Sequence, residues 1–187
     1  MESISVSEFL GKSTLIIGDV GVGKTKLTAL VVEELLKKGY GNDITIIDLA
    51  PMPVTYRGMQ VGGRVSNYVG IDPVRYLTSE SITAPRLTAK SRDELVDIIE
   101  RNRQLAESCL EKYLVSPTKI LTINDLTIYL HAGRLDIVTG CISKSETFIG
   151  NAYYGDSLKN DLGTGISTRE KQSIDRFCKI VDRVISL

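Results

Sequence analysis

The chain has 187 residues, which is enough for one compact α/β domain with its own hydrophobic core. Its 23 Lys and Arg residues balance 23 Asp and Glu residues, so the composition lacks the basic excess typical of nucleic-acid-binding proteins. The apolar content of 42% is ordinary for a globular protein, and no apolar run approaches the length of a membrane-spanning helix.

Cysteine and histidine usage narrows the chemistry further. Cys109, Cys141 and Cys178 are far apart and form no C-x-x-C pair, so they suit buried thiols in a reducing cytosol rather than disulfides or a zinc site. The first residues lack the basic and apolar regions of a signal peptide, and we therefore expect a cytoplasmic location. His131 is the single histidine, which excludes a metal cluster built on several histidines.

The first motif runs from Gly18 to Thr25 and fits the G-x-x-x-x-G-K-T pattern of a phosphate-binding loop. An apolar run at 14–17 predicts a strand before it, and an amphipathic pattern at 26–38 predicts a helix after it. Its glycines let backbone N–H groups face an anion, Lys24 can reach the β- and γ-phosphates, and the Thr25 hydroxyl can hold Mg²⁺. The residues expected to bind the nucleotide are Gly18, Asp19, Val20, Gly21, Val22, Gly23, Lys24, Thr25 and Lys26.

Two carboxylates follow predicted strands further along the chain. A strand at 44–47 ends at Asp48, and a strand at 119–123 ends in Asn124 and Asp125. An acid at the end of a strand near the phosphate loop can bind Mg²⁺ or orient the attacking water. We therefore predict Lys24, Asp125 and Asp48 as catalytic residues and Thr25, Asp125 and Asp48 as metal ligands. An alternative role for Asp125 is to cap the helix expected at 126–131.

Residues 52–90 are the least regular part of the sequence, with four glycines and three prolines that interrupt both helical and strand periodicity. We expect a lid-like insertion over the mouth of the site. Its arginines, at positions 57, 64, 75 and 86, could clamp a triphosphate, or could be solvated surface charges. Arg57 and Arg64 are the best candidates for a clamp, because they follow the second strand most closely.

Regular structure is predicted again from Ser91, where Ser91 to Glu94 fits a capping box at the start of a helix that runs to about residue 114. Two short helices are expected within 129–145, and His131 beside them is expected to be a satisfied polar group rather than a catalyst. A fourth strand at 146–150 places Asn151 at its end, where a polar group could sense the γ-phosphate.

The C-terminal part is predicted to hold a turn, a loop, a helix and a last strand. Residues 152–155 resemble a turn with exposed aromatics, and Tyr153 or Tyr154 could stack on a base or simply pack. Residues 167–170 fit a second capping box, which opens a helix that carries Ile174 and Phe177. The final strand is expected at 182–187.

The loop at 18–25 resembles the mark of the P-loop NTPase superfamily, and the layout is most similar to the RecA/KaiC-like ATPases. That likeness also includes Ser13 to Gly18 before the loop, Asn124-Asp125 after the third strand, Asn151 after the fourth and the segment 182–187 at the end. It departs from the family in having Asn before Asp125, and in offering Asp48 where the family usually has a catalytic Glu. No N-K-x-D motif is present, so the resemblance implies ATP rather than GTP.

These observations predict one domain, residues 1–187, with the P-loop NTPase fold: a three-layer α/β/α sandwich on a mainly parallel sheet of about five strands. The resemblance implies a Mg-ATP-binding protein that uses hydrolysis to drive a conformational change or a partner. Two alternatives remain: a small-molecule kinase or other transferase, and a non-hydrolysing nucleotide-bound switch or scaffold. The sequence leaves the protein or small-molecule partner open, and also whether the chain forms a homo-oligomer.

Overall fold

The computed structural model describes residues 5–56 and 58–187, and six of its strands form one parallel sheet. The strand order is β5-β2-β6-β7-β1-β8, so the two strands that precede and follow the first helix are separated by β6 and β7. This confirms the predicted parallel α/β class. The strands of the sheet are β1 Ser13–Gly18, β2 Ile44–Asp48, β5 Arg75–Thr78, β6 Ile120–Asn124, β7 Thr147–Tyr153 and β8 Arg183–Ser186.

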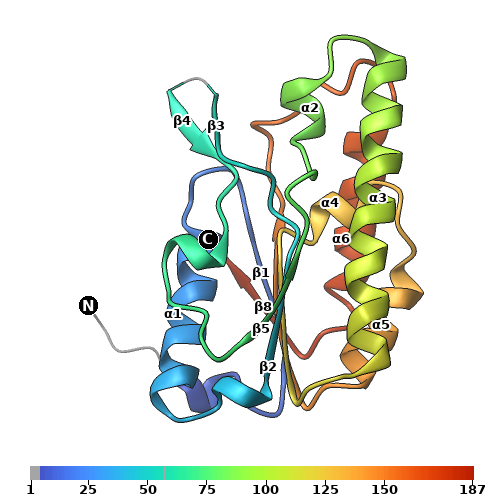
Figure 1. Ribbon diagram of the computed structural model, residues 1–187. Coiled ribbons are helices and arrows are strands. Elements are labelled where there is room, and N and C mark those ends of the chain that lie inside the picture. The colour runs from blue at the N-terminus through green and yellow to red at the C-terminus, as the bar shows by residue number, and fades with distance from the viewer. Residues whose placement is uncertain (1–4, 57) are drawn as a thin grey trace.

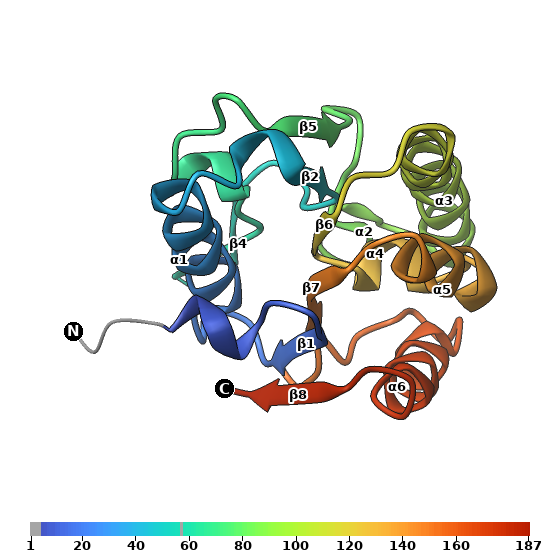
Figure 2. The same cartoon turned by 90° about the horizontal axis from the view of Figure 1, so that it is seen from below.

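Helices cover both faces of the sheet and complete the three layers (Figures 1 and 2). One face carries α1, Lys24–Lys37, and the other carries the longer group of α3, α5 and α6. The short helices α2 and α4 lie near the end of the sheet where the strands finish. The remaining helices are α2 Pro85–Thr88, α3 Arg92–Val115, α4 Thr127–Leu130, α5 Leu135–Ser143 and α6 Ile166–Phe177, with 3₁₀ turns η1 Val6–Glu8, η2 Gly41–Asp43 and η3 Val65–Asn67.

Alternation along the strands divides the core into two halves. In β1, Leu15 and Ile17 face the side of α3, α5 and α6, while Ile16 faces α1. In β2, Ile47 faces the side of α3, α5 and α6, and Ile46 faces α1. Successive side chains of a strand point to opposite faces, so strands covered by helices on both sides must be apolar almost throughout. This explains the continuous apolar runs that identify these strands in the sequence.

The segment 52–90 is more regular than predicted. It begins with an antiparallel hairpin, β3 Val54–Tyr56 and β4 Met59–Val61, and then contributes β5 to the edge of the main sheet beside β2. Arg75, in β5, donates to the carbonyls of Lys112 and Ser116 and so satisfies the last turn of α3. The strand of this partly irregular segment that joins the main sheet and was not predicted is β5, a short half-buried strand without a clear period of two.

Several predicted boundaries need correction. The capping box at Ser91 is confirmed, because its hydroxyl accepts from the Glu94 backbone N–H at 3.2 Å. The second capping box is wrong, because α6 begins at Ile166 after Gly165, whose φ of 73° places it in the left-handed region. The turn predicted at 152–155 is also wrong in part, because β7 continues to Tyr153, which is buried.

We expect Ser91→Ala to lower the free energy of unfolding by about 1 kcal/mol, because it leaves a backbone N–H at the start of α3 without its side-chain acceptor. Chemical denaturation monitored by circular dichroism measures this change. The matched control is Ser91→Asp, which retains an acceptor and is expected to unfold close to wild type. Equal stability of the Ala and wild-type proteins would contradict the role of this cap.

Candidate functional site

The phosphate-binding motif forms the turn between β1 and α1 at the carboxyl end of the sheet. Gly21 and Gly23 have φ values of 76° and 100°, a region that residues with a Cβ rarely adopt. Gly23 is also the N-cap of α1, so the positive end of the helix faces the turn. Lys24 Nζ donates to the Asp19 carbonyl at 2.6 Å, which holds the ammonium across the loop. Burial lowers the pKa of Lys24, against the opposing effects of Asp125 and Asp19.

Asp19 fastens this loop to the turn after β7. One carboxylate oxygen accepts from the Val20 N–H at 2.6 Å, and the other accepts from the N–H groups of Asp156 and Ser157 at 3.1 and 3.3 Å. Burial raises the pKa of Asp19, but these hydrogen bonds outweigh it and hold the pKa below its usual value. A Cβ at Gly155 would lie 2.4 Å from Asp19 Cγ, so this close approach requires glycine.

Asn124, at the end of β6, joins four elements around the loop. Its amide nitrogen donates to Asp48 Oδ1 at 2.7 Å and to the Gly63 carbonyl at 2.9 Å. Its amide oxygen accepts from Thr25 Oγ1 at 3.2 Å and from Asn151 Nδ2 at 2.6 Å. The side chain therefore makes four hydrogen bonds, which is its full ordinary capacity. Asn124 was predicted only as the residue before the acid, and this role as a hub was missed.

Asp48 is fully buried at the end of β2 and is surrounded by donors. One oxygen accepts from Asn124 and the Ala50 N–H, and the other accepts from the Val65 N–H at 2.7 Å and the Tyr76 hydroxyl at 2.6 Å. Burial raises the pKa of Asp48, and these hydrogen bonds oppose the rise. Asp48 therefore holds the edge strand β5 and the segment around η3 against β2.

Asp125 is placed differently from Asp48. Its backbone has a φ of 56°, and its N–H donates to Asn151 Oδ1 at 2.9 Å. Among residues 5–56 and 58–187, no hydrogen-bond donor or ion-pair partner contacts its carboxylate, which borders the cavity. Burial raises the pKa of Asp125 to about 7, while Lys24 acts in the opposite direction. The predicted cap of the next helix is not formed, because the N-cap of α4 is Leu126 and makes no side-chain bond.

Asn151 lies within β7 rather than at its end, and it bridges the sheet to α1. Its amide nitrogen donates to Thr28 Oγ1 at 2.9 Å as well as to Asn124. Thr28 in turn donates to the Lys24 carbonyl at 3.0 Å, one turn earlier in α1. The structure therefore brings Asn151, Thr25, Lys24 and Asp125 to the wall of one cavity.

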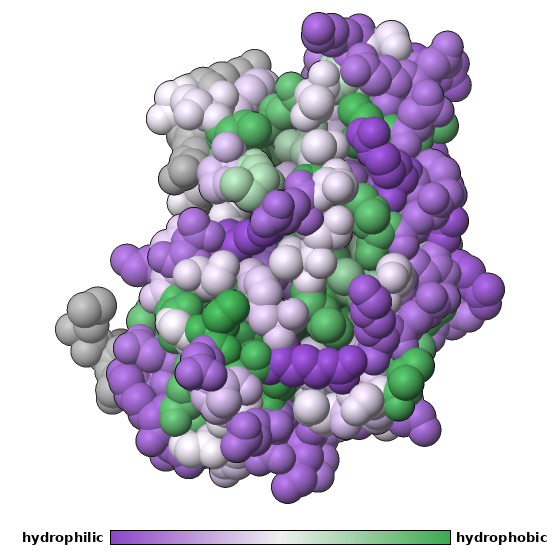
Figure 3. Space-filling model, viewed as in Figure 1, coloured by the Kyte–Doolittle hydropathy of each residue, from purple (hydrophilic) through white to green (hydrophobic). Residues whose placement is uncertain are grey.

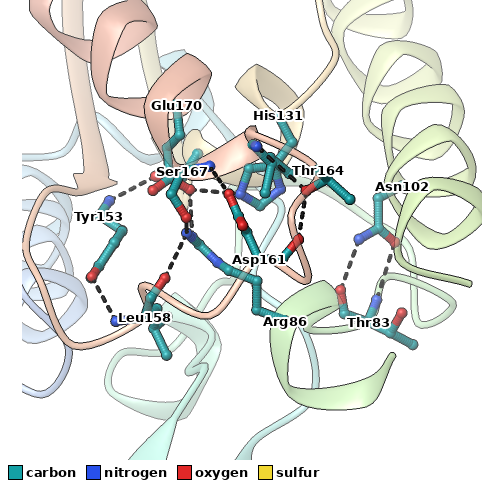
Figure 4. A network of polar contacts seen from close by, with 12 residues as sticks. Thr83, Arg86, Asn102, His131, Tyr153, Leu158, Asp161, Thr164, Ser167 and Glu170 are labelled. Atoms are coloured by element: carbon teal, nitrogen blue, oxygen red, sulfur yellow. Dashed lines mark hydrogen bonds and ion pairs between the residues drawn. The ribbon is translucent and has the colours of Figure 1, made fainter. Parts of the chain in front are cut away.

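A buried charged cluster lies at the other side of the cavity (Figure 4). Glu170 of α6 accepts from Arg86 of α2 at 2.5 Å and contacts His131 Nε2 at 2.7 Å. The exposed fractions of these side chains are 5% for Arg86, 4% for Glu170 and 3% for His131. Arg86 also donates to the Leu158 carbonyl at 2.9 Å and lies 5.3 Å from the centre of the Tyr153 ring. The pairing of Arg86 with Glu170 avoids the cost of an isolated buried charge.

One cavity of about 250 Å³ connects the phosphate loop to this cluster. The loop side is lined by residues 20–21 and 23–26, and the opposite side by residues 84–87, Ile128 and His131. Asp125 and Asn151 lie on its wall, whereas Asp48 does not. Gly18, Asp19 and Val22 belong to the loop without lining the cavity. Figure 3 shows that the face of the molecule seen in Figure 1 mixes hydrophilic and hydrophobic side chains.

The arginines that the structure describes in the 52–90 segment lie in different environments. Arg57, one of the two preferred candidates for a clamp, lies outside the described residues. Arg64 donates to the Ser79 carbonyl at 3.1 Å, and its buried Nε has no partner within the described chain. Of the three arginines of this segment that the structure describes, Arg86 lines the cavity.

The side chains around the loop fit a nucleotide-bound Mg²⁺. Thr25 and Asp125 present oxygen atoms on the cavity wall, and Mg²⁺ prefers oxygen ligands. Within the described ranges there is no group of three or more His, Cys, Asp or Glu residues placed to hold a metal by themselves. Mg²⁺ in phosphate sites usually keeps several waters and takes one or two protein ligands plus phosphate oxygens, so a closed protein cage is not required.

Comparison with known proteins gives little further information. No protein-family model matches the chain, and neither does any curated protein. Among solved structures, the chain is similar to the Pif1 helicase from Candida albicans, at 15% identity and a TM-score of 0.36. The match covers 95% of this chain and 36% of the helicase, so this chain spans about a third of that protein. Within the described residues, no helix combines the length and apolar character needed to cross a membrane.

The raised pKa of Asp125 predicts a pH-dependent effect on stability. A folded-state pKa of about 7, against about 4 when unfolded, disfavours the ionised group, so its contribution to stability falls as pH rises between these values. Asp125→Asn is therefore expected to gain stability relative to wild type from pH 4 to 7, with no further gain above. Urea unfolding at each pH measures this difference.

A matched control is Asp136→Asn, because Asp136 is exposed and its pKa is lowered by Arg134. Asp136→Asn is not expected to gain stability over the same window. A constant difference between Asp125→Asn and wild type across pH 4 to 7 would show that Asp125 titrates normally.

Proposed function

We propose that the chain binds Mg-ATP in the loop at 18–25 and hydrolyses it, using the energy to change conformation or to act on a partner. The observation that carries the proposal is the convergence of Lys24, Thr25 and Asp125 on one cavity at the carboxyl end of a parallel sheet. Ligands of open α/β sheets bind at this end. The loop supplies backbone N–H groups and a helix N-terminus for phosphate, and Lys24 supplies charge.

The roles of the side chains follow from their positions. Lys24 would leave the Asp19 carbonyl for phosphate oxygens, an exchange of a neutral acceptor for a charged one. Thr25 and Asp125 would hold Mg²⁺, which neutralises charge on the transferring phosphoryl group when bound. Asn151 would orient groups beside the γ-phosphate, because it already positions Asn124 and the Asp125 backbone. The RecA/KaiC-like relationship and a cytoplasmic location remain part of this proposal.

Asp125 is a better candidate than Asp48 for the acid that acts on metal and nucleophile. The Asp125 carboxylate borders the cavity, whereas both oxygens of Asp48 accept hydrogen bonds from protein groups. Freeing Asp48 for catalysis would leave the Val65 N–H and the Asn124 amide without an acceptor, which is costly in a buried site. We therefore assign Asp48 a positioning role.

A phosphotransferase that acts on a small molecule is the second candidate. The cavity continues past the phosphate loop to residues 84–87, Ile128 and His131, which leaves space beyond the position expected for the γ-phosphate. A hydrolase needs room there for one water, whereas a transferase needs room for an acceptor. The extent of the cavity favours this alternative, and nucleotide binding is common to both.

We expect Lys24→Ala to weaken binding of a non-hydrolysable Mg-ATP analogue by ~10-fold or more from a micromolar dissociation constant, because it removes the side-chain charge of the loop. Isothermal titration calorimetry measures both proteins. Lys179→Ala is the matched control, since it removes the same charge from an exposed position away from the cavity. Unchanged affinity in Lys24→Ala would remove the basis for nucleotide binding in this loop.

Two Asn substitutions test the assignment of the acids. Asp125→Asn is expected to lower turnover by ~10²-fold while the protein stays folded, because it removes charge at the metal and nucleophile. Asp48→Asn is expected mainly to lower stability, because a buried set of donors loses a charged acceptor. Phosphate release per folded molecule, with unfolding curves for both proteins, separates the effects. Loss of turnover in Asp48→Asn with normal turnover in Asp125→Asn would reverse the assignment.

A further inference from the structure

One residue that lines the cavity carries a buried polar atom without a hydrogen-bond partner among the described residues. His131 Nε2 contacts Glu170, but Nδ1 of the same ring is buried and has no partner among the residues that the structure describes. Leaving a buried polar atom without a partner costs free energy, so such atoms in native proteins usually have a functional reason. His131 lines the cavity that also contains the phosphate loop. A ligand in this cavity could supply the missing partner.

The cluster fixes which nitrogen of His131 carries the proton. Glu170 Oε2 also accepts from Arg86, whose charge is permanent, so Glu170 is expected to be the carboxylate that accepts from Nε2–H. Burial lowers the pKa of His131, although the bond to Glu170 opposes this, and Arg86 and Arg169 add to the lowering. The neutral ring therefore leaves a lone pair on Nδ1. A carboxylate that orients a histidine in this way is the arrangement that prepares a histidine as a base.

The position of Asp125 connects this cluster to the phosphate site. Asp125 lines the same cavity as Lys24 of the phosphate loop and Arg86 of the cluster. Ile128 and Thr127 line the cavity on the same side as His131. Among the described residues that line the cavity, His131 supplies the imidazole and Asp125 the carboxylate. Because we assign Asp125 to the metal, His131 is the residue available to accept a proton from the nucleophile.

Resting on the proposed function, we propose that His131 is the catalytic base, and that Nδ1 accepts the proton of the hydroxyl group that attacks the γ-phosphorus. In this step the hydroxyl oxygen forms a bond to phosphorus, and the bond between phosphorus and the β,γ-bridging oxygen breaks. The electron pair of the broken bond leaves with the diphosphate, and the hydroxyl proton moves to Nδ1. Glu170 is a positioning residue, which stabilises the imidazolium through Nε2–H.

The nucleophile is a neutral hydroxyl compound, either water or a small alcohol acceptor. Glu170 neutralises Arg86, which among the described residues is the cation that lines this side of the cavity, so the lining gives an anionic acceptor little attraction here. Its remaining walls include the apolar side chains of Pro85, Leu87 and Ile128. These walls can hold an uncharged carbon skeleton beside the hydroxyl group that His131 receives.

The first test needs no activity and uses the fact that His131 is the single histidine. In protein labelled with ¹⁵N-histidine, nitrogen NMR at pH 7 should show one neutral imidazole protonated at Nε2 and unprotonated at Nδ1. In Glu170→Gln, the preference for the Nε2–H tautomer should weaken. Wild-type protein with the proton on Nδ1, or with a charged ring at pH 7, would overturn the proposal, because Nδ1 could not then accept a proton.

The second test measures phosphoryl transfer from Mg-ATP by the 187-residue chain. His131→Gln should lower the turnover number by ~10²-fold and leave the affinity for the non-hydrolysable analogue unchanged. Cys141→Ala is the control for loss of stability alone, because Cys141 is buried in α5 away from the cavity. It should unfold more easily and keep normal turnover. Normal turnover in folded His131→Gln would overturn the assignment, whereas absence of analogue binding to wild type would refute nucleotide binding instead.

Phosphorus NMR distinguishes the two nucleophiles. Wild type is incubated with Mg-ATP in water alone and with glycerol or ethylene glycol at molar concentration. Inorganic phosphate alone identifies water as the nucleophile, and a new phosphate ester identifies an alcohol acceptor; either product should be lost in His131→Gln. Formation of neither product by a protein that binds the analogue would overturn both this inference and the hydrolytic part of the proposed function, while nucleotide binding would stand.

Discussion

The four hydrogen bonds of the Asn124 side chain hold the candidate site together. They connect the end of β6 to Asp48 of β2, to Gly63 in the 52–90 segment, to Thr25 of α1 and to Asn151 of β7. An amide can do this because it donates and accepts at once, whereas a carboxylate only accepts. If residue 124 carried a carboxylate, the Asp48 carboxylate and the Gly63 carbonyl would each face another acceptor instead of a donor. The structure thus places a neutral amide at the centre and the charged acid one residue later.

The order of these two residues, the amide Asn124 and then the acid Asp125, affects the whole cavity. Since Asn124 occupies the end of the strand, the chain turns at Asp125 through a positive φ, and the Asp125 carboxylate reaches the cavity wall. The Asp125 carboxylate therefore lies on the cavity together with Lys24 and Lys26. It does not belong to the group of hydrogen-bonded side chains around Asn124. Asp48 belongs to that group and stabilises the position of the segment after β4 through Val65. Two acids at neighbouring strand ends thereby acquire different environments, one rich in donors and one open.

Much of this fold could be predicted because strong local signals agree with one another. The glycine pattern, the flanking strand and the helix after it specify the phosphate loop, and the apolar runs identify β2 and β6. β5 was missed because its alternation is weak, and because its stability depends on pairing with β2. Asn124 was underestimated because its partners lie at sequence separations of 27 to 99 residues, which no local pattern reveals.

Glu170 shows how a local pattern can be interpreted wrongly. The sequence from Ser167 to Glu170 fits a capping box, yet the helix begins earlier and Glu170 lies on its inner side with Ile166 and Ile174. The spacing of four residues between these positions places all three on one buried face, and a carboxylate within an apolar stripe needs a buried partner. This spacing was the feature of the sequence that could have identified Glu170 as a buried carboxylate. Its partners, Arg86 and His131, come from segments 84 and 39 residues away and could be found only in the folded chain.

The balance of charge along the cavity links these observations. At the loop, Lys24 and Lys26 provide positive charge that only a bound anion would neutralise fully. At the far side, Arg86 is already neutralised by Glu170, and His131 is neutral. An anion is therefore attracted to one end of the cavity alone, and the other end favours an uncharged molecule. This difference in charge would orient a triphosphate with its phosphates at the loop and leave the position next to His131 for an uncharged nucleophile.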